Sequence, residues 1–426
     1  MNRPGKPSAE VFRRRRLLVL VGLVVLVSAA TWARTAHRHP AAAARTTAGG
    51  NANGADRSTT LPTEHTNIYA DIGPGHLAAR IAGDPARVYV PDSLSNTVSV
   101  IDPTTRKVID TFPTSDEPQH VVPSFDLKTL WVLDDAGNDV IPIDPATGRP
   151  GAPIPVTDPY NLYFSPDGAS AIVVAEAHSR LDFRDPHTMA LTGSLEVPGC
   201  AGINHADYDA SGSYMIVTCE YAGRLAKIDI VHRRVLGLLD LSAHPVRGQP
   251  MPAPSVMPDG MSASLMPQDV RTGPDGRHFY VADMRAGGVF VVDGDTFKVT
   301  RFIATGVGAH GITPSRDGTL FYVANRGSDQ INGPPHGPGS VSVIDPATNV
   351  VKATWIVPGG GSPDMGNLNA AGTELWLSGR FDREVYVFDT VHGVLAARIP
   401  VGKGPHGLTV WPQPGRYSLG HTGNMR

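Results

Sequence analysis

The chain has 426 residues and 41% hydrophobic content, which is enough to bury a large core as one repetitive domain or as two ordinary domains. Its formal net charge is −3 and the charged residues are interspersed, so we expect no basic surface for nucleic acid and no nucleic-acid partner. The 46 Gly and 38 Pro favour many short strands joined by tight turns, so the predicted fold class is all-β.

The N-terminal residues 1–33 are predicted to be a targeting segment. Four arginines, Arg13 to Arg16, directly precede an apolar run from Leu17 to about Ala33, which is the order of charged and hydrophobic regions in a signal sequence. The run is slightly short for a membrane span of about 20 residues and longer than the core of a typical signal peptide. We favour an uncleaved signal-anchor, with a cleaved signal peptide as the alternative.

The segment 34–65 is rich in Ala, Thr and Gly without apolar periodicity, and it is predicted to be a disordered tether. The folded domain is predicted to span residues 66–426. Because the arginine-rich flank stays in the cytoplasm, this domain is expected on the extracytoplasmic side of the cell membrane, or secreted if the signal is cleaved.

A phrase of about 40 residues recurs along the predicted domain. Strong copies are "ARVYVPDSLSNTVSVIDPTTRKVIDTF" and "HFYVADMRAGGVFVVDGDTFKVTRFI", each with three β-rich runs separated by polar turns. A further short run that ends in an Asp-Gly turn, such as "NLYFSPDG", precedes most copies. Four strands per repeat, without helical periodicity between them, predict a β-propeller of four-stranded blades.

The repeat resembles the YVTN-type propeller repeat, whose pattern is approximately "SPDG…YVAN…VSVID". Here the pattern is carried by Ser165 to Gly168, Tyr322 to Asn325 and Val341 to Asp345. The resemblance implies the propeller fold from about Gly75 to the C-terminus. It implies little about activity, because such repeats are scaffolds for many functions.

The number of blades follows from how the ring closes. Seven complete repeats are counted from about Gly75 to Val401, and the residues from His406 onward supply the first two strands of another. The segment from Thr66 to Ile72 is expected to add an outer strand, so that N- and C-terminal strands share a closing blade. This count favours eight blades, and the alternative is seven blades with the terminal strands lying over the first blade.

The two cysteines, Cys200 and Cys219, flank a predicted hairpin whose turn is "DASGS". An oxidising compartment favours a disulfide between them, and two buried thiols are the alternative. Neither cysteine belongs to a CxxCH motif, so covalent attachment of c-type haem has no support.

Two insertions interrupt the repeats. Residues from Ala243 to Leu265 are rich in Pro and Met and are expected to form a loop without regular strands. Its methionines suit a soft metal such as Cu(I) but are better explained as flexible apolar filler. These methionines are Met251, Met257, Met261 and Met266. The second insertion, "SDQINGPPHGPG", contains His336, which is expected in a solvated loop.

The first residues of the inner strands are polar or able to bind metals in every repeat. Inner strands line the channel of a propeller, so equivalent positions would form a ring. The predicted ligand-binding residues are His76, Asn161, Asn204, Gln268, Asp269 and Asp364. The predicted metal ligands are His120, His205, His310 and His406. Turn chemistry at a solvated rim competes with this interpretation, and because strand neighbours point to opposite sides, not all histidines need face one centre.

Repeated aspartates are predicted to be turn residues rather than a carboxylate site. They are Asp102, Asp167, Asp275, Asp317 and Asp345. Short polar side chains at such positions accept hydrogen bonds from backbone N–H groups two residues further on.

Three functions remain open from the sequence. The first is a membrane-tethered propeller that binds a protein or small-molecule ligand at its mouth. The second follows from a fold-level resemblance to the propellers of d-type haem enzymes and nitrous oxide reductase, and implies a redox accessory that handles haem or a metal such as copper or zinc. The third is a lactonase-like hydrolase in which calcium, held by residues such as Asn161 and Asp364, polarises a ring ester.

Overall fold

The computed structural model describes residues 68–69, 72–244, 251–260, 262–331 and 337–422. All of them belong to one compact unit, Pro62–Arg426. The predicted targeting segment and tether, together with Met261 and His336, lie outside the described residues. Within the described ranges, no helix has the length and apolar character needed to cross a membrane.

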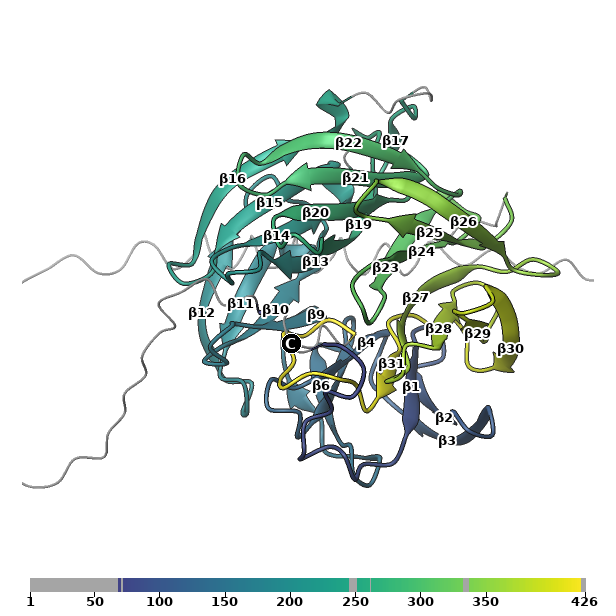
Figure 1. Cartoon of the computed structure of the whole chain (residues 1–426). Helices are drawn as coiled ribbons and strands as arrows, with labels where there is room; N and C mark the ends of the chain where they lie inside the picture. Colours follow the sequence, from purple (N-terminus) through teal and green to yellow (C-terminus); the bar gives the residue numbers. More distant parts are fainter. Residues whose placement is uncertain (1–67, 70–71, 245–250, 261, 332–336, 423–426) are drawn as a thin grey trace, which may run out of the picture. The chain divides into compact units, whose positions relative to one another are not determined.

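The described chain folds into seven antiparallel sheets arranged around a centre, which we number as blades 1 to 7 in chain order (Figure 1). From the inner to the outer strand, blade 1 is β31 (Thr409–Trp411), β1 (Arg87–Asp92), β2 (Thr97–Asp102) and β3 (Lys107–Pro113). Blade 2 is β4 (Pro118–Pro123), β5 (Leu130–Asp134), β6 (Asp139–Asp144) and an outer strand split into β7 (Arg149–Pro150) and β8 (Ile154–Pro155). Blade 3 is β9 (Pro159–Phe164), β10 (Ala171–Ala175), β11 (Arg180–Arg184) and β12 (Leu191–Glu196).

The remaining blades repeat the same order. Blade 4 is β13 (Ile203–Tyr208), β14 (Met215–Cys219), β15 (Arg224–Asp229) and β16 (Arg234–Asp240). Blade 5 is β19 (Pro267–Thr272), β20 (His278–Asp283), β21 (Gly288–Asp293) and β22 (Lys298–Ala304). Blade 6 is β23 (Ala309–Pro314), β24 (Phe321–Asn325), β25 (Ser340–Asp345) and β26 (Val350–Ile356). Blade 7 is β27 (Pro363–Leu368), β28 (Glu374–Gly379), β29 (Glu384–Asp389) and β30 (Val394–Pro400).

Burial explains why these segments are strands. Inner strands such as β4 are buried at every position, whereas outer strands such as β16 alternate exposed and half-buried side chains. The core lies between neighbouring blades: one cluster joins Tyr89 and Val100 of blade 1 to Val132 and Ile143 of blade 2. Blades therefore stabilise one another by packing face to face around the ring.

The ring closes in blade 1, and the prediction of eight blades is wrong. The C-terminal strand β31 pairs with β1 in the register Tyr89↔Thr409, so it fills the inner position that the first repeat lacks. The segment around His76 is not a strand and forms only a bridge, Leu77↔Gly415. Ile68 and Tyr69 lie in a turn rather than in the expected outer strand. The alternative of seven blades is confirmed, and the C-terminal strand completes blade 1 instead of lying over it.

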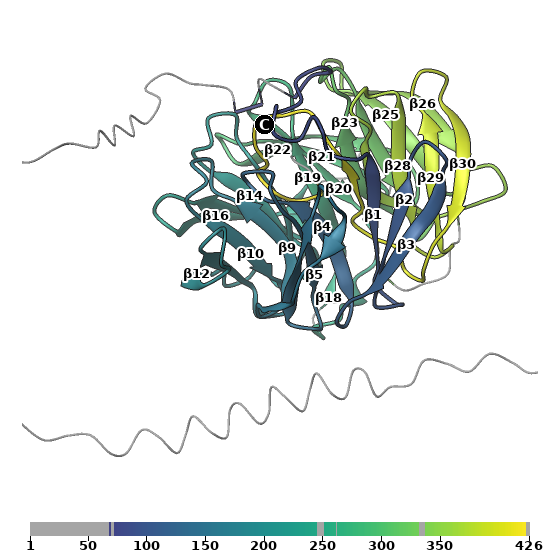
Figure 2. The ribbon, with the colours of Figure 1, turned by 90° about the horizontal axis from the view of Figure 1, so that it is seen from below.

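After β31 the chain continues as a tail, residues 412–422, that crosses one end of the propeller (Figure 2). Phe164 N–H donates to the carbonyl of Leu419, and Ser418 N–H donates to the carbonyl of Phe125. His421 N–H in turn donates to the carbonyl of Leu162. The tail therefore binds the ends of the inner strands of blades 2 and 3 and places His421 at the centre of the ring.

The methionine-rich insertion lies at the opposite end, where Figure 2 shows β18. It contains a short hairpin of β17 (Ser255–Val256) and β18 (Ser262–Ala263), so the expectation of no regular strand is wrong for four residues. Met257 and Met266 pack with Met284 in one apolar cluster, as the filler interpretation requires. Three 3₁₀ turns complete the described secondary structure. They are η1 (Glu176–His178), η2 (Glu220–Ala222) and η3 (Leu241–Ala243).

The predicted disulfide between Cys200 and Cys219 is confirmed. Cys219 ends β14 and faces Ile203, the first residue of β13, so the bond fastens the chain leading into the inner strand of blade 4. By closing a loop of this size, a disulfide contributes about 3 kcal/mol to stability, chiefly by restricting the unfolded chain.

Candidate functional site

The inner strands carry a β-bulge at their start in blades 2 to 7. In blade 4 the register runs from Ile203↔Cys219 to Ala206↔Val217, so that Asn204 and His205 together face one partner residue. The same shift occurs between Pro267 and Val270 in blade 5 and between their counterparts in the other blades. A bulge interrupts the alternation of side chains along a strand. Two consecutive polar residues can therefore reach toward the channel from one strand.

The four histidines predicted as metal ligands converge at the centre of the ring. Their ring centroids are 4.9 Å apart for His120 and His406, 5.6 Å for His406 and His310, and 5.4 Å for His120 and His205. The tail adds His421, whose ring centroid lies 4.9 Å from that of His205. All five are at most 3% exposed. The histidines thus form a buried cluster in the channel and not a solvated rim.

Close approach of blades 1 and 2 requires a glycine beside this cluster. Gly407 N–H donates to the carbonyl of Gln119, and Val121 N–H donates to the carbonyl of Gly407. A Cβ atom at Gly407 would lie 2.1 Å from Cδ2 of His120, far inside contact distance. The "HG" that precedes the closing strand is therefore set by packing against the imidazole of His120.

His310 lies between a cation and an anion. Nη2 of Arg326 is 2.7 Å from His310 Nε2, and Asp364 Oδ1 is 2.9 Å from His310 Nδ1. A guanidinium only donates hydrogen bonds, so Nε2 must accept and Nδ1 must carry the proton. Arg326 Nε also donates to Asp364 Oδ1 over 2.7 Å. The three side chains form one buried, charge-balanced unit between blades 6 and 7.

His120 and His205 form a second pair. His120 Nδ1 is 2.8 Å from the carbonyl of Tyr160 and therefore donates to it, which leaves Nε2 as an acceptor. That atom is 3.4 Å from Nε2 of His205, so the proton between them belongs to His205. His205 Nδ1 is then a bare acceptor, and it has no hydrogen-bond partner among the described residues.

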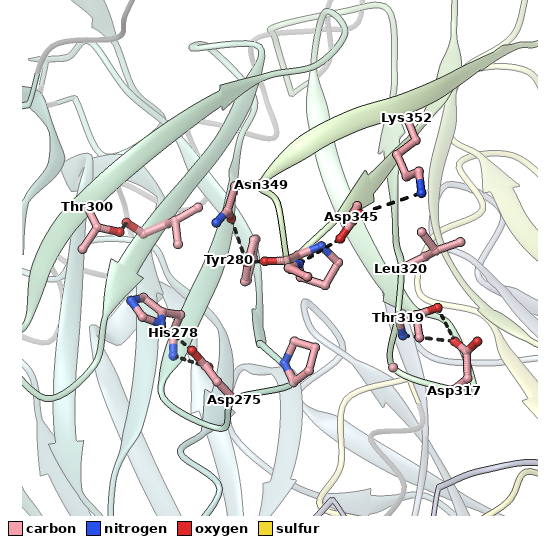
Figure 3. Close-up of a pocket in the computed structure, with 15 residues that line it drawn as sticks. Asp275, His278, Tyr280, Thr300, Asp317, Thr319, Leu320, Asp345, Asn349 and Lys352 are labelled. Atoms are coloured by element: carbon pink, nitrogen blue, oxygen red, sulfur yellow. Dashed lines mark hydrogen bonds and ion pairs between the residues drawn. The ribbon is translucent and has the colours of Figure 1, made fainter.

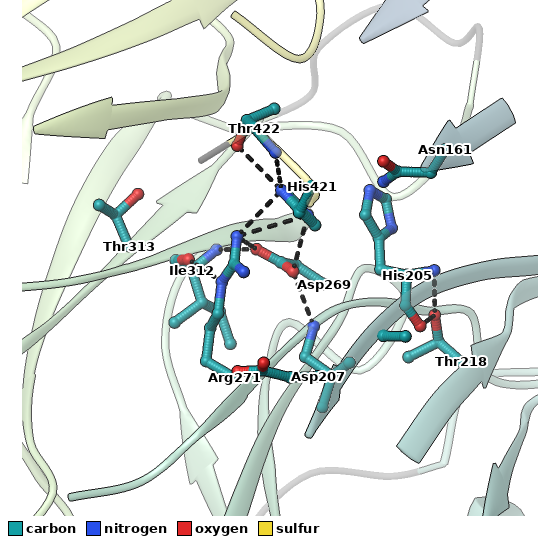
Figure 4. Close-up of polar contacts among 12 residues, drawn as sticks. Asn161, His205, Asp207, Thr218, Asp269, Arg271, Ile312, Thr313, His421 and Thr422 are labelled. Carbon is teal, nitrogen blue, oxygen red and sulfur yellow. Dashed lines mark hydrogen bonds and ion pairs between the residues drawn. The ribbon is translucent and has the colours of Figure 1, made fainter. Parts of the chain in front are cut away.

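His421 is held from two sides (Figure 4). Nδ1 accepts from the N–H of Thr422 and lies 3.1 Å from Nη2 of Arg271, while Nε2 is 3.2 Å from Asp269 Oδ1. Asp269 also accepts from the N–H of Ile312 in blade 6. Asp269 and Arg271 therefore join the inner strands of blades 5 and 6 to the tail, which is a structural role.

Burial keeps the cluster neutral. Desolvation lowers the pKa of all five histidines, that of His120 to about 4. Burial alone would raise the pKa of Asp364, but Arg326, His310 and His406 outweigh it and hold that pKa well below its usual range. At neutral pH the imidazoles of the cluster are therefore uncharged, and the carboxylate of Asp364 beside them is ionised.

The residues predicted to bind a ligand are placed unequally. Asn161, Asn204, Gln268, Asp269 and Asp364 are buried at the starts of inner strands. His76 is exposed and lies before β1, outside the channel, because β31 holds the inner position of blade 1. Five of the six predicted ligand-binding residues therefore lie in the channel. His76 was misplaced because the repeat pattern assigned it to an inner strand that β31 supplies instead.

Metal binding at this centre stays a prediction. Across the described residues, no three His, Cys, Asp or Glu side chains lie in an arrangement able to hold a metal ion. The two carboxylates of the predicted set, Asp269 and Asp364, are each held by an arginine, and Asn204 Nδ2 donates to Glu220. The carboxylates proposed as ligands are thus already paired with cations of the protein.

Sequence reasoning missed a second ring of polar residues. The residue that directly follows the second strand of each blade is buried, and it is charged in five of the seven blades. These residues are Ser93, Asp135, Glu176, Glu220, Met284, Arg326 and Arg380. The signal was present in the sequence as the position after each "YVAN"-like tetrapeptide, for example in "YVANR" and "VTCE".

A surface pocket of about 890 Å³ lies between blades 5 and 6 and is lined by none of the five channel histidines (Figure 3). It includes three of the repeated aspartates. Asp275, Asp317 and Asp345 accept hydrogen bonds from backbone N–H groups two residues further on, those of Arg277, Thr319 and Ala347. The prediction that these carboxylates cap turns is confirmed.

Comparisons with known proteins support the fold. A family model described as YNCE-like beta-propeller matches residues 260–414, which span blades 5 to 7 and the closing strand. No curated protein sequence matches the chain. Hydrazine synthase of Kuenenia stuttgartiensis is similar in structure, with 17% identity, a TM-score of 0.54 and coverage of 68% of this chain and 88% of that one.

Two further structures are similar at comparable levels. The dihydro-heme d1 dehydrogenase NirN, in complex with DHE, has 14% identity and a TM-score of 0.54, and the similarity covers 81% of each chain. A functionally unknown protein from Desulfotomaculum acetoxidans has 15% identity and a TM-score of 0.57 over 76% of this chain and 98% of that one. With its seven four-stranded blades, the described chain is a seven-bladed β-propeller, and residues 260–414 are similar to the YNCE-like beta-propeller family.

Proposed function

We propose that the protein is an extracytoplasmic, membrane-tethered propeller that binds a small polar ligand in its channel. The observation that carries this proposal is a set of buried polar atoms around the histidine cluster that find no hydrogen-bond partner in the described part of the chain. They are His205 Nδ1, His406 Nδ1, Asp364 Oδ2, Asn204 Oδ1 and Gln119 Oε1. Each such atom costs about 1–3 kcal/mol when it is left without a partner.

These atoms share a chemical character. The carboxylate and amide oxygens are acceptors, and so is the bare nitrogen of His205. A site rich in buried acceptors favours a ligand that donates several hydrogen bonds, and a ligand that satisfies them regains the energy of their desolvation.

Ligand binding is expected to raise the melting temperature of the full chain. A ligand present at one hundred times its Kd stabilises a fold by about 2.7 kcal/mol, which raises the melting temperature measurably. The probes are glycine, 4-aminobutyrate, putrescine, succinate and inorganic phosphate. The shift should disappear in His205→Leu, which removes the bare acceptor. It should persist in His232→Leu, whose exposed ring pairs with Asp229 at the surface. Equal shifts in wild type and His205→Leu would contradict binding in the channel.

The tether is tested separately on intact cells. The arginines before the apolar run motivate it, because a positively charged flank remains in the cytoplasm. We expect alkaline carbonate to leave the full chain in the membrane pellet and external protease to release a resistant fragment that starts near Thr66. Extraction into the supernatant would contradict an uncleaved anchor, and a protected segment before Ala55 would contradict the disordered tether.

A further inference from the structure

The seven residues after the second strands form one ring at the end of the channel where the inner strands begin, which we call the junction ring. Its members are Ser93, Asp135, Glu176, Glu220, Met284, Arg326 and Arg380. Each comes from a different blade at an equivalent position, so the propeller geometry arranges them around the axis. They are between 0 and 8% exposed.

Contacts between successive blades run along this ring. Nη1 of Arg380 in blade 7 donates to Oγ of Ser93 in blade 1 over 2.9 Å. Nη1 of Arg326 in blade 6 lies 3.6 Å from Sδ of Met284 in blade 5. The hydroxyl of Tyr221, next to Glu220, donates to Glu176 of blade 3 over 3.2 Å. Side-chain contacts at or beside the ring therefore link blade 3 to 4, blade 5 to 6, and blade 7 to 1.

Charge is segregated around the junction ring. The three acidic residues belong to the consecutive blades 2, 3 and 4, and the two arginines belong to blades 6 and 7. Met284 and Ser93 separate the two arcs. Opposite charges that face each other across a poorly hydrated channel produce a strong local field. One side of this mouth thus favours a cation and the other side an anion.

One charge on each side lacks an ion-pair partner among the described residues. Glu220 accepts a hydrogen bond from Asn204 Nδ2 over 2.6 Å, but no cation lies within ion-pair distance. Arg380 uses only Nη1, toward Ser93 and the carbonyl of Gly404, and its Nε and Nη2 donate to no described residue. Fully buried charges are normally paired, because desolvation penalises the ionised form.

We propose that the junction ring binds a small zwitterion, with its ammonium at the acidic arc and its carboxylate at Arg380. The inference rests on the proposed ligand-binding function and names the class of ligand. An ammonium provides three donors for Glu220 and for the unpartnered Oδ1 of Asn204 beside it. A carboxylate can accept from Nε and Nη2 of Arg380 at the same time, which is the bidentate geometry of strong guanidinium recognition.

The two arginines have different roles in this site. Arg326 is already neutralised by Asp364 and bonded to His310, so it is a fixed part of the channel wall. Arg380 has no carboxylate within ion-pair distance among the described residues and is the group that a ligand anion would satisfy. A ligand with only one charge would leave either Glu220 or Arg380 uncompensated, so the zwitterion is favoured over a simple amine or acid.

Isothermal titration of the full chain tests the proposal. The probes are glycine, β-alanine, 4-aminobutyrate and 6-aminohexanoate, which differ in the spacing of their charges, with butylamine and butyrate as the separate halves. We expect at least one zwitterion to bind ten or more times tighter than either half, which corresponds to about 1.4 kcal/mol. Glu220→Gln and Arg380→Gln should each weaken it by at least about tenfold, whereas Arg224→Gln, an exposed arginine of blade 4, should not.

Proton release provides a second readout that folding alone would not change. Burial raises the pKa of Glu220, and a bound ammonium would lower it again, so binding at mildly acidic pH should release protons and make the enthalpy depend on the buffer. This dependence should vanish in Glu220→Gln, whose melting temperature without ligand verifies that it folds.

The outcomes separate the two proposals. Binding of a zwitterion that is unchanged in Glu220→Gln and Arg380→Gln would overturn the junction ring as its site and leave channel binding intact. Stabilisation by succinate, putrescine or phosphate alone, lost in His205→Leu, would also overturn the zwitterion and leave the proposed function. No binding of any probe would contradict both.

Discussion

Replacing Trp411 with alanine is expected to lower the free energy of unfolding by about 3–5 kcal/mol, the range for truncating a large buried aromatic side chain. Trp411 ends the closing strand β31 and is 1% exposed. It packs in the cluster between blades 1 and 2, and its Nε1 donates to Asp84 over 2.9 Å. Its loss creates a cavity beside the C-terminal strand that supplies the inner position of blade 1. The change is measured by urea unfolding monitored by far-UV circular dichroism, a signal that does not depend on tryptophan.

Trp355→Ala is the matched control. Trp355 lies on the outer strand of blade 6, half-buried, and stacks near Tyr322 and Phe388. Its truncation leaves the ring closure untouched and removes less buried surface, so the expected loss is smaller. An equal or greater loss for Trp355→Ala would contradict the importance that we assign to the closing strand.

The local features of the fold could be predicted from the sequence. The alternating "VSVID" runs and the Asp-Gly turns depend on interactions within a hairpin, and both form strands and turns where the pattern indicates them. The closure could not be predicted in the same way. "HGLTVW" has the pattern of an inner strand, but nothing local identifies the blade that it joins, because its partner β1 lies over 300 residues earlier.

The convergence of the channel histidines was predicted from the repeat, but the expected direction of their side chains was partly wrong. Strict alternation along a strand argued that His120 and His310 need not face one centre, but the bulges at the strand starts bring both inward. His421 could not be found by alignment, because the tail has no counterpart in the repeats. The pairing of Arg326 with Asp364 crosses from one blade to the next, and such pairs are not specified by the repeat of either blade.

Replacing Arg326 with methionine is expected to destabilise the protein by about 3–5 kcal/mol, because it leaves the carboxylate of Asp364 buried without its nearest cation. Methionine retains much of the length of the side chain and can keep contact with Met284. Asp364→Leu combined with Arg326→Met removes both charges, and this pair should recover a large part of the loss. A double variant as unstable as Arg326→Met alone would assign the effect to packing instead of charge.

The pH dependence of this loss tests the same mechanism. In the folded wild type the pKa of Asp364 is held well below its usual range. In the unfolded chain a carboxylate has a pKa of about 3.9. The ionised form of Asp364 therefore stabilises the fold fully above this pH, and the stabilisation is lost only in stronger acid. Without Arg326, burial raises the pKa of Asp364, and the neighbouring His310, whose pKa Arg326 also lowers, protonates more readily. Both changes let the folded variant take up protons in mild acid. The difference in unfolding free energy between wild type and Arg326→Met should therefore shrink as the pH falls from about 7.5 to about 5. A difference that stays constant over this interval would show that Asp364 is not the group left unpaired.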